Sequence, residues 1–293
     1  MKHKGNIFFI DILKVIAIVL IIFFHTWYNL KKPIPREVGF VGVSLFFIIS
    51  GYLLKIRYPR LKELSSKYFK KRYLKIAPPY YLSLILVAVL LGKQAASGNI
   101  IGNLISHFLF VDFLFLEYKY GIISPAWFLI PLIMLYLLYP YLNKYNSKYK
   151  WFFGAAFLLS LVIKFHEGTL ASFSPFFFLG EFLFGMLLAQ NRRKEAILIS
   201  LFSILINPWM GLPFAIFFIF SMEKLKLPEN RIIKFLSKQT LWLFLIHESI
   251  LKVAIGRWKI HHLNTVYSLI ILILSWSLIF YASKKITRRL IRN

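Results

Sequence analysis

The sequence contains no cysteine and few acidic residues. Of its 293 residues none is Cys and 11 are Asp or Glu, against 37 Lys or Arg. The missing cysteines exclude disulfides, thiolate metal sites and a cysteine nucleophile. No internal repeat, low-complexity tract or appended soluble module interrupts the chain, so we expect residues 1–293 to form a single domain. Nucleic acid is not an expected partner, because no soluble module exists to hold it.

Apolar residues, in contrast, are abundant. They make up 59% of the chain, with a mean hydropathy of +0.67, whereas a soluble domain is nearer half apolar. The apolar runs are long and continuous rather than alternating, which favours helices over a barrel. The sequence therefore predicts an all-α integral membrane protein in the bilayer of the cell (plasma) membrane. Residues 8–28 are not expected to be a removable signal peptide, because they contain charged residues and lack a small-residue cleavage site.

The distribution of positive charge predicts the topology. Ten spans are expected, at residues 8–28, 38–55, 77–92, 125–142, 151–166, 174–190, 196–208, 209–222, 240–256 and 265–283. With residues 104–116 re-entrant or at the outer surface, 27 Lys and Arg lie on the cytoplasmic side and nine outside. If that segment crossed, the counts would be 16 and 20. The positive-inside rule thus favours about ten spans with both termini cytoplasmic. The net charge of +26 fits this bias, and it also fits a partner that bears phosphates.

The first apolar run carries three ionisable residues, Asp11, Lys14 and His25. Such residues are costly in a membrane and by default mark a site. Lys14 and His25 are eleven positions apart, so they share a helix face about 16 Å apart along the axis. A neutral imidazole can act as general base for a sugar hydroxyl. Two blander interpretations stay open: His25 bridges helices by hydrogen bonds, and Lys14 reaches the inner interface with Asp11 as its partner.

A basic cluster precedes the Pro78-Pro79 pair. Lys71, Arg72 and Lys75 lie within about one and a half helical turns of each other. Arg offers a planar fork for phosphate oxygens and Lys a point charge, so the cluster fits a phosphate clamp. Simple anchoring at the inner membrane surface explains it equally well.

Further polar or aromatic residues sit in the later apolar runs. Small residues around Ser44 favour close helix packing, and Trp127 is expected at the outer interface. Glu181 is a buried acid. His247 and Glu248 are neighbours in a span, and their side chains point about 100° apart. No motif of metal-ligand spacing occurs, so no metal is expected.

These motifs, taken in order, resemble the acyltransferase family 3 of integral-membrane O-acyltransferases over nearly the whole chain. The family's first-helix signature is a basic residue, ten residues and an essential histidine, which Lys14 and His25 match. Ser44 stands where an acid is common in the second-helix motif. Arg72 and Lys75 match an Arg-x-x-Arg stretch, with Lys replacing one Arg. The central motif begins at Trp127, and residues 245–247 look like a late Leu-x-His element.

The resemblance implies a membrane O-acyltransferase. It would move an acyl group, usually acetyl, from cytoplasmic acetyl-CoA or another acyl-CoA to a hydroxyl of a cell-surface or lipid-linked carbohydrate. His25 would be catalytic, and Lys14, Lys71, Arg72 and Lys75 would bind the cofactor. Homo-oligomers or glycan-synthesis partners stay open. Two alternatives remain at this point: a transporter or flippase of lipid-linked sugars, and a structural partner of a glycan synthase.

Overall fold

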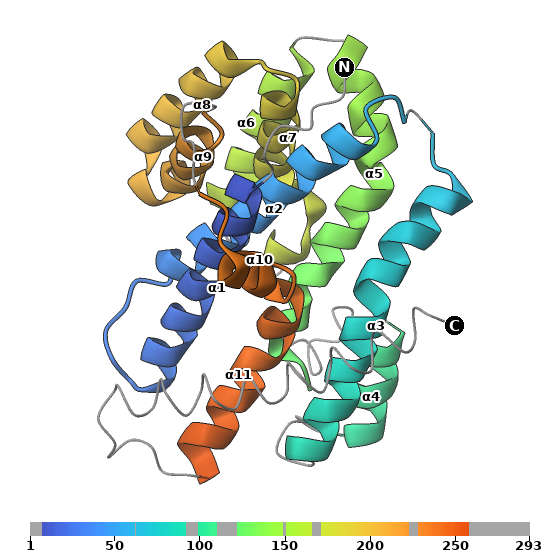
Figure 1. Ribbon diagram of the computed structural model, residues 1–293, viewed down its shortest axis with the longest axis vertical. Coiled ribbons are helices and arrows are strands. Elements are labelled where there is room, and N and C mark those ends of the chain that lie inside the picture. Colours follow the sequence, from blue (N-terminus) through green and yellow to red (C-terminus); the bar gives the residue numbers. More distant parts are fainter. Residues whose placement is uncertain are drawn as a thin grey trace. The chain divides into compact units, whose positions relative to one another are not determined.

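The computed structural model of the chain describes residues 8–61, 63–91, 99–109, 122–148, 151–165, 171–222 and 228–257. In these residues helices are joined by turns and loops, and no strand occurs, as the apolar runs predict (Figure 1). The described residues fall into two compact units. The first takes them from 1–21, 35–69 and 128–238, and the second from 22–34, 70–127 and 239–293.

Three helical stretches of the described part are long and apolar enough to cross a membrane. They are Phe8–Asn29, Glu37–Arg57 and Ser124–Tyr145. Further apolar helices are shorter, and they coincide in position with spans expected from the sequence. The described part of the protein is therefore all-helical and apolar enough for a membrane, while the expected number of ten spans stays a prediction. The expected span at 265–283 lies outside the described residues.

The first unit contains the start of α1 (Phe8–Asn29) and most of the remaining helices. These are α2 (Glu37–Arg57), α5 (Leu129–Lys148), α6 (Phe152–Phe165), α7 (Leu179–Ala189), α8 (Arg193–Ile206), α9 (Pro208–Phe220) and α10 (Arg231–Ser237). Short 3₁₀ segments at Ala171–Phe173 and Pro175–Phe178 lead into α7. The side chain of Asn230 caps α10 by accepting from the amides of Ile232 and Ile233.

Glycines allow α2 and α7 to pack with their backbones in contact. A Cβ atom added at Gly51 would lie 1.9 Å from the carbonyl oxygen of Phe182, and one at Gly185 would lie 2.0 Å from that of Ile48. Gly42 meets α1 in the same way, because its added Cβ would lie 2.4 Å from the oxygen of Ala17. The close packing predicted from the small residues is confirmed. It fixes where the side chains of α2 and α7 meet.

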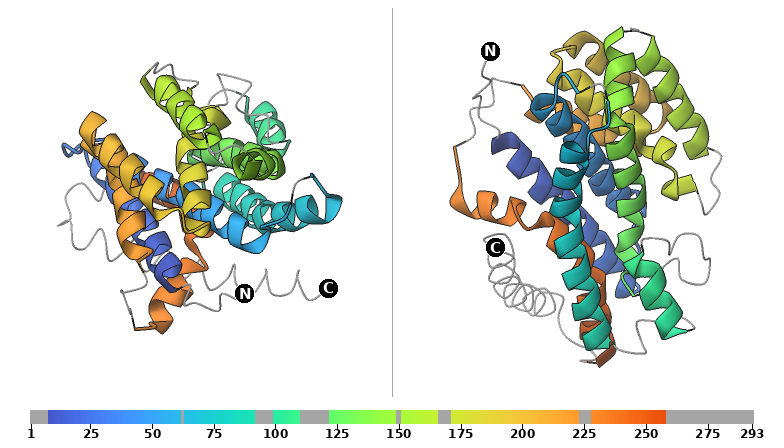
Figure 2. Two further views of the ribbon diagram at one scale, coloured as in Figure 1. Left: turned by 90° about the horizontal axis from the view of Figure 1, so that it is seen from above. Right: turned by 90° about the vertical axis from the view of Figure 1, so that its right-hand side faces the viewer.

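The helices α8 and α9 form a hairpin around Asn207 (Figure 2). The Asn207 side chain accepts from the amide of Trp209 at 2.9 Å and caps α9. At a rise of about 1.5 Å per residue, the two helices measure about 21 and 20 Å, short of a ~30 Å hydrocarbon core. Both elements are confirmed as helices, and their length explains why neither qualifies as a span by itself.

The second unit contains the end of α1, most of α3 (Ser66–Leu91), α4 (Ile100–Phe108) and α11 (Thr240–Arg257). The span predicted at residues 77–92 coincides with the later part of α3, which begins at Ser66, before the basic cluster, and runs through Pro78 and Pro79. Proline removes the hydrogen bond to the carbonyl four residues earlier, and its ring pushes against that carbonyl, which kinks a helix. Those carbonyls belong to Leu74 and Lys75, which are exposed. The helix can therefore continue through the pair.

The segment predicted not to cross the membrane begins within α4. Nine residues span about 14 Å, less than half of a hydrocarbon core. The rest of the segment, from residue 110 on, lies outside the described residues. The non-crossing assignment therefore stays a prediction.

Candidate functional site

The second unit brings His25 of α1 next to His247 of α11. The centres of the two rings are 4.9 Å apart, and their planes make an angle of 62°. His25 is half-buried, whereas His247 is completely buried. Sequence spacing gave no reason to pair them, because 222 positions separate them. The structure thus places the predicted catalytic histidine beside a second imidazole.

The hydrogen bonds of His247 fix its tautomer. Its Nδ1 lies 2.6 Å from the carbonyl oxygen of Phe244 and 3.2 Å from that of Leu243. A carbonyl oxygen only accepts, so Nδ1 carries the proton and the neutral ring has its lone pair on Nε2. Nε2 is buried, and no described residue gives it a hydrogen bond. Glu248, the next residue, is half-buried. His247 and Glu248 therefore differ in burial, as expected for side chains that point about 100° apart on a helix.

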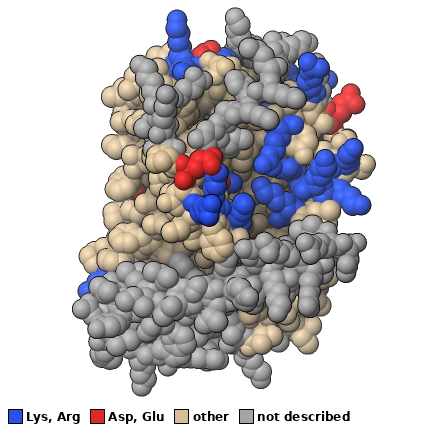
Figure 3. Space-filling model, in the orientation of Figure 1, with Lys and Arg blue, Asp and Glu red and all other residues tan. Residues whose placement is uncertain are grey.

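The three residues of the predicted phosphate clamp on α3 differ in how deeply they are buried. Lys71 and Lys75 are exposed, while Arg72 is buried with 8% of its surface accessible. Figure 3 shows Lys and Arg side chains gathered over the first half of α3. The two lysines offer point charges at the surface, and the arginine belongs to the interior side of the helix. Their role in binding phosphate stays a prediction.

Lys14 and Asp11 form an ion pair in the first unit. The Lys14 Nζ lies 3.9 Å from Asp11 Oδ1, and both side chains are about one quarter exposed, at 23% and 25%. Ser237 of α10 donates a hydrogen bond of 2.5 Å to the same carboxylate oxygen. The partnership of Lys14 with Asp11 that the sequence left open is therefore present. It does not exclude a ligand, because Lys14 keeps part of its surface exposed.

A buried polar cluster joins α2, α6 and α7 in the first unit. Ser44 donates to Glu181 Oε1 at 3.1 Å, and Lys164 forms an ion pair with the same oxygen. All three residues are buried, and the Lys164 Nζ lies 5.5 Å from the ring centre of Phe177. Ser44 stands where the family resemblance expects an acid, and here it contacts an acid of another helix.

Sequence reasoning missed Lys164. A signal was present, since Lys164 is the only charged residue in the apolar stretch 152–165, and intramembrane cations usually have a partner.

Trp127, in the 3₁₀ segment Ser124–Phe128, is half-buried. Among the described residues, no group of three or more His, Asp or Glu could hold a metal ion.

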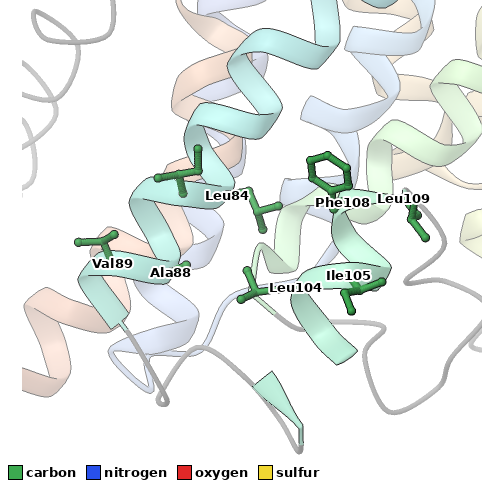
Figure 4. A pocket seen from close by; sticks show the side chains of 8 residues that line it. Leu84, Ala88, Val89, Leu104, Ile105, Phe108 and Leu109 are labelled. Atoms are coloured by element: carbon green, nitrogen blue, oxygen red, sulfur yellow. The ribbon is translucent and has the colours of Figure 1, made fainter. Parts of the chain in front are cut away.

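The α3–α4 pair carries a second buried histidine and an apolar groove. Tyr80 donates to the carbonyl oxygen of His107 at 2.8 Å, and burial lowers the pKa of His107 to about 4. The nearby groove encloses about 470 Å³ (Figure 4). Its lining side chains are Leu84, Ile85, Ala88, Val89, Leu104, Ile105, Phe108 and Leu109. None of these side chains can hydrogen-bond, so the groove cannot orient a sugar hydroxyl or a phosphate.

Comparison with known proteins adds to this geometry. Residues 7–220 match the family described as acyltransferase domain. Peptidoglycan O-acetyltransferase OatA of Listeria monocytogenes is 28% identical over 148 residues, which cover 45% of this chain and 23% of the relative. The chain therefore spans less than a quarter of that relative's length. No solved structure matches the chain.

Proposed function

Because this chain belongs to the acyltransferase domain family, we propose that it is a membrane O-acetyltransferase of a carbohydrate. It moves an acetyl group from cytoplasmic acetyl-CoA to a hydroxyl of a cell-surface or lipid-linked glycan. The family match covers residues 7–220 and thus confirms the resemblance to acyltransferase family 3 and the assignment as an acyltransferase. The name of the relative OatA supports acetyl transfer to a cell-wall glycan. A transporter finds no such support.

The half-buried His25 is the observation that carries the chemistry. Among the described residues of the matched segment, it is the one histidine in a helix long and apolar enough to cross a membrane. His25 takes the proton of the acceptor hydroxyl, and the oxygen attacks the thioester carbonyl. The C–S bond then breaks, the thiolate of coenzyme A leaves, and the proton on His25 returns to the thiolate. Partial exposure is what this role requires, because a substrate must reach the ring.

The donor site is proposed at the cytoplasmic end. The exposed Lys71 and Lys75 attract phosphates, and Arg72 supplies a planar fork. The unbroken course of α1 supports the distance argument. Lys14 and His25 are about 16 Å apart along its axis, similar to the ~15–20 Å of an extended pantetheine arm. We propose that this arm carries the thioester toward His25.

This arrangement requires the ten-span topology with both termini in the cytoplasm. The chain has no native cysteine, so single cysteines report sidedness directly. Lys32 and Lys144 are exposed, and Lys32→Cys is expected to react with an impermeant maleimide from outside. Lys144→Cys is expected to react only after the membrane is opened. Reaction of Lys144→Cys in intact cells would overturn the topology.

The direct test is transfer of radiolabel from [¹⁴C]acetyl-CoA into membrane glycan. Inside-out vesicles containing the protein are expected to incorporate label, whereas vesicles with the His25→Ala variant at equal abundance are not. Mild alkali should release the label as acetate, because the product is an ester. Incorporation that is equal with and without the protein would contradict the proposed function.

A further inference from the structure

Two buried imidazoles, His107 and His247, have no task in the chemistry described so far, and of these two the structure places His247 against His25. His247 is completely buried, and its Nδ1–H is used by backbone carbonyls of its own helix. Its Nε2 lone pair has no hydrogen-bond partner among the described residues. A buried acceptor left in this state costs about 1–3 kcal/mol.

The distance between the two rings suggests what Nε2 does. The ring centres are 4.9 Å apart, and each ring nitrogen lies about 1 Å from its centre. Nε2 makes no hydrogen bond with the described residues in this structure, but a rotation of the His25 ring that turns one of its nitrogens toward Nε2 brings the two atoms to hydrogen-bond distance. We propose that His247 is a positioning residue, whose Nε2 lone pair accepts the ring N–H of His25. The other His25 nitrogen then keeps its lone pair for the acceptor hydroxyl. This inference rests on the proposed role of His25 as the base.

Such a contact would act on both states of His25. A neutral imidazole has one donor and one acceptor nitrogen, and a base must have the acceptor nitrogen toward its substrate. An N–H bond to His247 fixes that tautomer. After His25 takes the hydroxyl proton it is an imidazolium, and its bond to His247 becomes charge-assisted and stronger. No proton moves to His247, because the proton on His25 returns to the leaving thiolate.

Two substitutions separate this role from a structural one. In His247→Asn, the side-chain amide reaches the place of Nδ1 and can keep the bond to the backbone, but nothing remains at the place of Nε2. In His247→Gln, the amide oxygen reaches the place of Nε2 and can accept from His25. We expect His247→Asn to lower kcat about 10–100-fold with little change in KM, since the contact acts on the reacting base. His247→Gln should recover most of the loss.

A matched control uses the other buried histidine of the unit. His107→Asn alters a ring whose Nδ1 lies 3.2 Å from the hydroxyl of Tyr80, and it should leave kcat near the wild-type value. Thermal unfolding in detergent should be similar for all three variants. If kcat of His247→Asn equals the wild-type value, or if Asn and Gln reduce kcat equally, the positioning role is wrong.

A readout without any acyl donor keeps this inference separate from the proposed function. Diethyl pyrocarbonate carbethoxylates an unprotonated imidazole nitrogen, and mass spectrometry of the peptide reports the rate at His25. His247→Asn should slow the reaction at His25 several-fold, and His247→Gln should not. An inactive wild-type protein that still shows this difference would contradict acetyl transfer but support the pairing. Equal His25 reactivity in all variants would overturn the pairing whatever the activity.

Discussion

A buried cluster in the first unit and a histidine pair in the second hold their ionisable groups in different ways. In the first cluster, the charges of Lys164 and Glu181 neutralise each other, and Ser44 adds a hydrogen bond to the shared oxygen. The pair His25 and His247 consists of imidazoles that can be neutral, and Nε2 of His247 keeps a lone pair with no described donor. The cluster around Lys164 and Glu181 is stabilised by opposite charges. The pair of His25 and His247 keeps a nitrogen that can accept a hydrogen bond.

This difference suggests a division of tasks. The buried ion pair joins α6 to α7, and removing one partner would leave an uncompensated buried charge. An imidazole is the side chain whose protonation changes most readily near neutral pH. We therefore expect substitutions in the first unit to reduce stability and substitutions of His25 to reduce rate. The following predictions test that expectation.

The largest effect is expected for His25→Ala. Loss of a general base typically lowers the rate by about 10²–10⁴-fold. Because His25 is only half-buried, its removal should change the unfolding temperature little. Initial rates of acetyl transfer and thermal unfolding of the same purified sample provide the measurement. A near-normal transfer rate would show that His25 is not catalytic. A large drop in the unfolding temperature would show that its role is structural.

Breaking the buried ion pair should reduce stability instead. Glu181→Leu leaves the Lys164 cation buried without its counter-charge, at a cost of about 3–5 kcal/mol. The double variant Glu181→Leu with Lys164→Met removes both charges and should recover most of that loss. Denaturant unfolding in detergent micelles measures both. If the double variant is as unstable as the single one, the pair is not what holds the cluster.

A packing test in the same unit uses two glycines. Gly51→Ala places a methyl group 1.9 Å from the oxygen of Phe182, so α2 and α7 must separate, with an expected cost of about 1–3 kcal/mol. Gly154→Ala is the control, since its added Cβ has no atom within 4 Å and alanine favours a helix. The temperature of thermal unfolding should be lower for Gly51→Ala than for the wild type, and unchanged or higher for Gly154→Ala. Equal unfolding temperatures would contradict the close packing.

The sequence predicted the features that depend on a single helix. Apolar run length and periodicity place α1 and α2 to within two residues, and the shared face of Lys14 and His25 follows from the unbroken α1. For α3 the sequence predicted only the span at residues 77–92, whereas the helix begins at Ser66 and includes the basic cluster. Local rules for proline do not decide whether the preceding basic residues form a helix, since the tertiary environment contributes.

Partners that lie far apart in the chain could not be predicted. Glu181 was recognised as a buried acid, but its contacts with Ser44 and Lys164 depend on how three helices pack. The same holds for His247 beside His25. Charge balance could have suggested that Glu181 needs a cation, and the isolated Lys164 was the available candidate. The missing information was the order in which helices neighbour each other, which hydropathy does not contain.

The smallest expected effect concerns the basic residues of α3, and it extends the comparison to the surface of the second unit. Arg72 is buried while Lys71 is exposed, so a phosphate bound by Arg72 is less screened by water and salt. Arg72→Ala should raise the KM for acetyl-CoA about tenfold with kcat nearly constant, a loss of ground-state binding. Lys71→Ala should raise it only a few-fold, and its effect should fade as salt is added, because exposed charges are screened. Steady-state kinetics at low and high salt measure both. A constant KM with a reduced kcat for Arg72→Ala would place this residue outside the donor site, whereas equal salt sensitivity of the two variants would show that burial does not distinguish them.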